Sequence, residues 1–155
     1  MIRITDQYFW NVVFGLFFVA LVIMGSIILD TEAHMTYADL DLFDIVIISL
    51  ASFRMIRLFV FDTMTKFFRE QFYDAKVTKA GKVTLYKPLT GPRRTIADLM
   101  GCPWCFGVWA SAIIIFFYLL TPAAFFPILI LAISAVATFM QNVSRLVSAK
   151  ADVVS

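Results

Sequence analysis

The chain has 155 residues, of which 61% are hydrophobic, and its mean hydropathy is +0.87. A soluble domain carries about 45–50% apolar residues, so this composition excludes a water-soluble globular protein. The formal net charge of +2 gives no electrostatic reason to expect a nucleic-acid partner. We therefore expect a single membrane domain over residues 1–155, in contact with the lipid bilayer.

Four segments are long and apolar enough to cross a bilayer, which requires roughly 20 residues. They cover about residues 8–29, 42–61, 103–120 and 123–143. The first is longer than the apolar core of a secretory signal, and Asp30 and Glu32 follow it where a cleavage site would lie, so we expect it to be retained. The sequence predicts an all-α integral membrane protein with four transmembrane helices.

The connecting segments differ in charge, and this difference predicts the orientation. Between the first two helices lie five acidic residues and no basic one: Asp30, Glu32, Asp39, Asp41 and Asp44. Residues 62–101 carry eight basic side chains: Lys66, Arg69, Lys76, Lys79, Lys82, Lys87, Arg93 and Arg94. Because basic loops stay in the cytoplasm, we expect a multi-pass plasma-membrane protein whose two termini and residues 62–101 are cytoplasmic. Anionic lipid would face that segment.

Residues 62–101 are the one sizeable polar segment of the chain. Aromatic residues among charged ones in 63–72 suit a helix that continues the second span along the membrane surface. Alternation of residue types around a Gly predicts a hairpin over 76–86. Thr95 and Asp98 resemble a capping box, which predicts a short amphipathic helix that begins there.

Both cysteines of the chain, Cys102 and Cys105, lie at the start of the third predicted helix. Pro103 suits the first helical position and puts Cys102 near the N-cap, where the helix dipole stabilises a thiolate. The Cys-Pro-Trp-Cys order resembles the glutaredoxin active site over four residues. A cysteine pair with this spacing indicates metal binding or thiol redox chemistry.

Three uses of the cysteine pair stay open. The cytoplasm keeps thiols reduced, so a structural disulfide is not expected. Zinc needs four ligands and the one histidine, His34, lies in the opposite loop, so a zinc site would require two copies of the chain. The pair therefore packs a tight helix entrance as buried thiols, binds an intersubunit zinc, or acts as a redox or modified thiol. We expect no other cofactor.

Arg54 and Arg57 lie three residues apart on one face of the second predicted helix. A charge deep in a span costs at least about 2.5–3.5 kcal/mol, and Arg54 is harder to extend to the headgroups than Arg57. Arg54 therefore needs a partner, for which Asp62 and Asp98 are candidates. The alternatives are an internal ion pair and a site for an anion or a lipid headgroup.

Arg93 and Arg94 directly precede the predicted helix at 95–100. Two arginines ahead of a helix N-terminus can hold a phosphate, because the free N–H groups there also favour anions. The alternative is ordinary cytoplasmic positive charge that rests on anionic lipid.

Several stretches occur together in a distinctive order: residues 50–62 with both arginines, Arg69-Glu70, Gly91-Pro92-Arg93-Arg94-Thr95, and Gly101 to Trp109 with the cysteine pair. This order resembles a family of small bacterial and phage membrane proteins catalogued as domain of unknown function thirteen-sixty. The likeness covers about residues 45–120. It implies that the second helix, the basic segment and the entrance of the third helix form one cytoplasmic-side cluster.

No Ser/His/Asp set, no pair of carboxylates within a span and no P-loop is present, so an enzyme is not favoured. Small residues, Gly107 with Ser111 and Ser134 with Thr138, permit close helix contacts. We therefore expect a protein that acts through homo-oligomeric assembly, as a scaffold, channel or accessory subunit. The two alternatives are a thiol or metal protein centred on the cysteines and an anion- or phospholipid-binding protein centred on the arginines.

Overall fold

The computed structural model describes residues 2–77 and 83–154. Six α-helices and one two-stranded sheet follow in the order α1 (Ile2–Glu32), α2 (Leu42–Val60), α3 (Lys66–Glu70), β1 (Asp74–Val77), β2 (Val83–Tyr86), α4 (Pro92–Gly101), α5 (Pro103–Leu120) and α6 (Phe125–Val154). Short 3₁₀ helices at Tyr37–Asp39, Thr63–Thr65 and Pro122–Ala124 turn the chain between them. The protein is all-α apart from the hairpin, as the sequence predicts.

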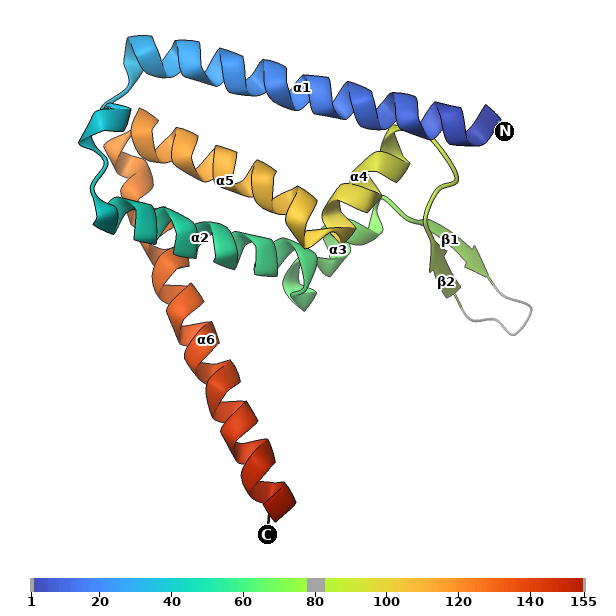
Figure 1. Ribbon diagram of the computed structural model, residues 1–155. Helices are drawn as coiled ribbons and strands as arrows, with labels where there is room; N and C mark the ends of the chain where they lie inside the picture. The colour runs from blue at the N-terminus through green and yellow to red at the C-terminus, as the bar shows by residue number, and fades with distance from the viewer. Residues whose placement is uncertain (1, 78–82, 155) are drawn as a thin grey trace.

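Three long helices lie alongside one another, with α5 between α1 and α2 (Figure 1). Helix α4 and the hairpin lie at the N-terminal end of α1, and α4 contacts both α1 and α5. Helix α6 packs its first half on α2, crosses the other helices steeply, and extends its second half away from them. The two termini are therefore far apart.

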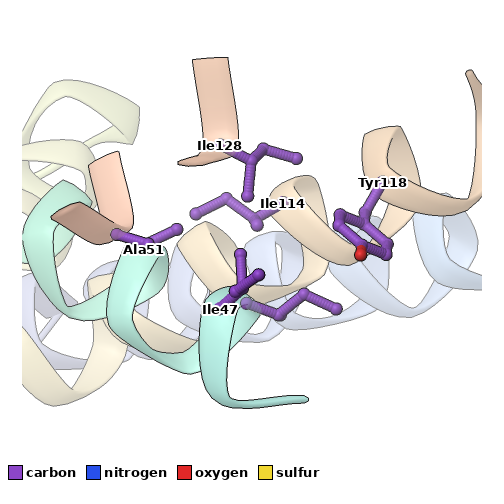
Figure 2. Packing of buried hydrophobic residues seen from close by; sticks show 7 residues of the cluster. Ile47, Ala51, Ile114, Tyr118 and Ile128 are labelled. Atoms are coloured by element: carbon purple, nitrogen blue, oxygen red, sulfur yellow. The ribbon is translucent and has the colours of Figure 1, made fainter. Parts of the chain in front are cut away.

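The core lies where α2, α5 and α6 meet. Ile47 and Ala51 of α2, Ile114 and Tyr118 of α5, and Ile128 and Ala132 of α6 form one buried cluster (Figure 2). Ala51 is completely buried, and small residues such as this let two helix backbones approach closely. Gly107 has the same effect between α5 and α2, because a Cβ there would lie 3.2 Å from Ile56 Cδ1.

Polar groups fix both ends of α2. At its start the backbone N–H of Asp41 donates to the Asp44 carboxylate at 3.1 Å, which satisfies one free N–H of the first turn. At its end the Thr65 hydroxyl donates to the Leu58 carbonyl, and the Arg69 guanidinium donates to the carbonyls of Phe59 and Val60. These carbonyls have no partner within the helix, so Thr65 and Arg69 hold the next segment against the end of α2.

Within the described residues, three helices are long and apolar enough to cross a membrane: Asp6–Glu32, Pro103–Leu120 and Pro122–Lys150. The second matches its predicted bounds, whereas α1 and α6 extend beyond the predicted 8–29 and 123–143. Helix α2 has the predicted length but carries Asp44, Arg54 and Arg57. It is therefore not among these three helices, and the predicted span over 42–61 stays a prediction.

Two predictions for residues 62–101 are wrong in detail. The helix expected over 63–72 is broken, because the chain turns at Asp62 and only the short α3 follows. Thr95 and Asp98 do not form a capping box, because α4 begins at Pro92. Gly91, whose φ is 100°, precedes it, a conformation that glycine adopts without steric cost, and proline suits the first helical position.

The predicted hairpin is present. Strands β1 and β2 pair antiparallel, with Asp74 opposite Tyr86 and Val77 opposite Val83. Its turn at 78–82 lies outside the described residues.

Replacing Ile47 with Ala should destabilise the junction of α2, α5 and α6. Ile47 is 4% exposed, whereas Ile45 on the same helix is 51% exposed and makes a matched control. We expect Ile47→Ala to lower the free energy of unfolding by about 2 kcal/mol, the low end for buried large-to-small changes, because transfer from water adds little between membrane helices. Unfolding by SDS from mild detergent micelles measures both variants. An equal loss for Ile45→Ala would contradict this account of the core.

Candidate functional site

Cys102 is the N-cap residue of α5. Its extended backbone directs the side chain to the first turn, where Cys102 Sγ accepts a hydrogen bond from the Cys105 backbone N–H at 3.3 Å. Pro103 occupies the first helical position, as predicted. Both thiols are free, and Cys105 is exposed.

The thiol of Cys102 is more acidic than an ordinary cysteine. The Cys105 thiol donates a hydrogen bond that lowers the pKa of Cys102, and the backbone N–H groups of Cys105 and Trp104 lower it further. Slight desolvation opposes this shift without reversing it. Cys102 therefore carries a larger fraction of the reactive thiolate at neutral pH than an ordinary cysteine does.

Both cysteines line a cavity of about 550 Å³ between α1, α4 and α5. Polar side chains close its end near the start of α1. Gln7 donates to the Thr95 hydroxyl at 3.0 Å, and that hydroxyl lies 3.3 Å from Asn11 Oδ1. These contacts attach α1 to α4, and we refer to the space beside them as the polar cavity.

Lys87 and Asp98 place opposite charges at the same cavity. Lys87 Nζ lies 2.8 Å from Asp98 Oδ1, and Arg94 Nε lies 2.9 Å from Asp98 Oδ2. Partial burial raises the pKa of Asp98, but the hydrogen bonds from Lys87 and Arg94 and their charges outweigh it and lower the pKa below its usual value. Asp98 is therefore ionised at neutral pH. Its pair with Lys87 connects α4 to the segment after β2 at the wall of the polar cavity.

Arg54 has the acidic partner that its depth in α2 requires. Its Nη1 lies 3.2 Å from Asp62 Oδ2, and the Arg54 side chain is only 16% exposed. Arg57 lies over the Phe61 ring, 6.0 Å from its centroid. Among the described residues, Arg57 has no carboxylate partner, and the Nε atoms of both arginines are buried without a hydrogen bond. Arg54 and Arg57 of α2 therefore carry two positive charges beside the one carboxylate of Asp62.

The four arginines of the predicted anion site do not share one counter-ion: Arg54, Arg57, Arg93 and Arg94. Arg93 bonds to the Asp74 carboxylate at 3.3 Å and to the Gln71 carbonyl at 2.9 Å, which ties α4 to the hairpin. Arg94 bonds to Asp98 and to the Pro88 carbonyl. Arg93 and Arg94 therefore connect parts of residues 62–101, and each is paired with a carboxylate of the same chain.

Sequence reasoning missed the residues that complete the polar cavity. Gln7 and Asn11 are four residues apart, so they share a face of α1, and this polar pair at the start of an apolar helix was the available signal. Lys87 had no local pattern that marked it, because it reaches Asp98 only through the turn after β2. In the described parts of the chain no group of three His, Cys, Asp or Glu side chains could hold a metal ion.

The fold and the site define an all-α protein with three candidate membrane-spanning helices and a polar junction where the starts of α1 and α5 meet α4. The chain belongs to the family described as protein of unknown function (DUF1360), whose sequence pattern matches residues 47–144. This is the family that the arginine and cysteine motifs indicate.

Two relatives from Bacillus subtilis (strain 168) are similar to part of the chain. One, named sporulation protein YjcA, is 39% identical over 103 residues, which are 63% of this chain and 87% of the relative. The other, named UPF0713 protein YngL, is 32% identical over 100 residues, which are 63% of this chain and 75% of the relative. No solved structure matches the chain significantly.

Removing the Cys105 thiol should make Cys102 less acidic. In the Cys105→Ala variant the thiol donor to Cys102 Sγ is lost, so the midpoint pH for alkylation of Cys102 by iodoacetamide should rise. Cys105→Ser keeps a hydroxyl donor at the same place and should shift the midpoint less. Mass spectrometry of the Cys102 peptide after timed alkylation at several pH values gives the midpoints. Identical midpoints in all three proteins would show that the Cys105 side chain does not tune Cys102.

Proposed function

We propose that this chain is a four-span plasma-membrane protein that acts through self-association of α6, with both termini and residues 62–101 in the cytoplasm. The observation that carries the proposal is the second half of α6, which leaves the rest of the chain (Figure 1) and keeps an apolar stripe exposed. The charges of the loops support the orientation. The name of the relative YjcA supports a role in sporulating cells.

Helix α2 supplies the fourth span in this proposal. Its 19 residues extend about 28 Å at 1.5 Å per residue, close to the roughly 30 Å of bilayer hydrocarbon. Asp44 and Arg57 lie toward its two ends, whereas Arg54 lies nearer its middle. Asp44 accepts a hydrogen bond from the Tyr118 hydroxyl at 2.6 Å, and Arg54 is paired with Asp62. These partners lower the cost of placing the charges near hydrocarbon.

Helix α6 has a buried apolar face and an exposed apolar face directly beside it. Ile128, Ala132 and Ala135 are buried on the first face. The second face consists of exposed residues at spacings of three and four: Ile133, Val136, Met140, Val143 and Val147. We call this second face the α6 seam. Spacings of three and four over two heptads are the pattern by which two helices pack as a coiled coil.

Lipid alone does not explain the α6 seam. In the last turns of α6, exposed polar side chains lie between the seam residues in the sequence: Gln141, Ser144, Arg145 and Ser148. The 30 residues of α6 extend about 45 Å, longer than the hydrocarbon layer, so part of the seam would lie beyond it. A second copy of α6 would cover the apolar side and leave the polar side in water.

A charge in the α6 seam should break the assembly. We expect the double variant Val143→Glu/Val147→Glu to raise the dissociation constant at least tenfold, about 1.4 kcal/mol, because paired seams would bring like charges together. Gln141→Glu/Ser148→Glu adds the same charge on the polar side and should leave the assembly intact. Native mass spectrometry from detergent measures both. A monomeric wild-type protein, or equal loss in the two variants, would remove the proposal.

A second function is favoured by the unbalanced charge at the end of α2. We propose that Arg57 holds the phosphate of an anionic lipid beside the Arg54–Asp62 pair. Arg57 has a guanidinium without a carboxylate among the described residues, and its Nε is buried without a partner. A guanidinium binds phosphate through two parallel hydrogen bonds.

Arg57→Gln should weaken this headgroup site. A basic side chain near the membrane surface contributes about 1 kcal/mol, so the variant should retain roughly fivefold less phosphatidylglycerol after purification from mixed micelles. Lys66→Gln removes one charge from the neighbouring α3, where Lys66 is exposed, and serves as the control. Lipid mass spectrometry gives the ratio of phosphatidylglycerol to phosphatidylcholine. Equal retention in the wild-type protein and in Arg57→Gln would contradict the proposal.

A further inference from the structure

Two cavities meet along the contact of α1 with α5. The polar cavity lies near the start of α1, and a second cavity of about 380 Å³ lies farther along the same two helices. Phe18 of α1 and Trp109 of α5 line both cavities. Their ring centroids are 4.8 Å apart. The two cavities therefore adjoin at this aromatic pair, and we call them together the groove.

The second cavity is apolar. Leu21 and Ala112 are among the residues that line it, and the Ser26 hydroxyl on its wall is already bonded to the Val22 carbonyl at 2.9 Å. The groove narrows at Gly25, where a Cβ would lie 3.3 Å from Phe116 Cδ2. Both volumes fall within the range of about 300–1,000 Å³ found for ligand sites. The apolar half suits a hydrocarbon chain.

The polar half offers both signs of charge. Lys87 has three N–H donors, of which one meets Asp98 Oδ1, and the Asp98 carboxylate accepts from Lys87 and Arg94 with further lone pairs to spare. Thr95 and Asn11 add hydroxyl and amide groups to the same wall. A headgroup with a phosphate and a primary ammonium could bond to Lys87 and to Asp98 at once. A purely anionic headgroup could bond to Lys87 but would offer no donor to the Asp98 carboxylate.

We propose that this groove binds one phospholipid of the phosphatidylethanolamine class, with an acyl chain between α1 and α5 and the headgroup in the polar cavity. The change from apolar to polar walls matches an amphiphile along its length. A helix from a second copy would leave the charged end unfilled, and a water-soluble phosphate would leave the apolar end empty. Assigning the lipid to the cytoplasmic leaflet rests on the proposed topology, whereas the binding site itself does not.

Side chains that fill the groove test the site. Gly15 lines the polar cavity, and nothing lies within 4 Å of a Cβ added there, so Gly15→Phe should fill that half. Ala112→Phe blocks the apolar half. Val108→Phe adds the same bulk on an exposed part of α5 and is the control. Native mass spectrometry follows lipid retained from micelles with equal phosphatidylethanolamine, phosphatidylglycerol and phosphatidylcholine.

We expect the wild-type protein and Val108→Phe to retain one phosphatidylethanolamine per chain, and Gly15→Phe and Ala112→Phe to retain at least tenfold less. Thermal unfolding of each variant identifies any that fails to fold. The two blocking substitutions lie on different helices, so one blocking variant that folds is enough to test the site. Retention in a folded blocking variant overturns the proposal. If the wild-type protein is a dimer without bound lipid, and both blocking variants are monomers, the groove binds a second copy of the chain. That outcome overturns the proposal as well.

Headgroup selection tests the charge argument separately. Asp98→Asn removes the carboxylate that faces the ammonium, so phosphatidylglycerol should replace phosphatidylethanolamine as the retained lipid. Unchanged preference in folded Asp98→Asn overturns the assigned headgroup class. The Val143→Glu/Val147→Glu protein should still retain phosphatidylethanolamine, because the groove lies within one chain. That result separates failure of the assembly proposal from failure of the groove proposal.

Discussion

The close approach of α2 to α5 and α6 is the constraint on which the rest of the structure depends. Ala51 is fully buried where these helices meet, and Gly107 lets Ile56 pack against α5. Membrane helices gain little from excluding water, so they associate through dense packing. This packing fixes the end of α2, where Thr65 and Arg69 hold the following segment, and it fixes α5, whose first residues carry the cysteines and meet α4.

Helix α1 is attached differently, and its attachment explains the groove. Its polar contact with α4 runs through Gln7, Asn11 and Thr95, and its aromatic contact with α5 runs through Trp109. Helices held at separate points leave space between them, in contrast to the continuous packing around Ala51. The same chain thus combines a tightly packed three-helix junction with a loosely attached helix that leaves room for a ligand.

Local signals explain which parts of the fold could be predicted from the sequence. Pro103 and the Thr121-Pro122 pair punctuate α5, so its bounds were predicted correctly. No Gly or Pro follows Pro127, so no helix-breaking residue ends α6 where the hydropathy falls. The predicted end at residue 143 was based on hydropathy, which marks a membrane boundary and not the end of a helix. The capping-box prediction failed because Gly91 and Pro92 start α4 earlier. Asp62 was among the partners that the sequence offered for Arg54, beside Asp98, helix-end carbonyls and lipid phosphate. The meeting of Lys87, Asn11 and Thr95 depends on tertiary contacts that no local pattern encodes.

The position of Trp109 gives the protein a built-in optical reporter. Trp109 is one of three tryptophans, and its indole forms the wall between a hydrocarbon-lined space and a charged one. Indole emission shifts with the polarity of its surroundings, so the colour of this one fluorophore depends on what fills each side of it. With Trp10 and Trp104 replaced by phenylalanine, the chain would report the contents of its own interior in an intact membrane, without an added label.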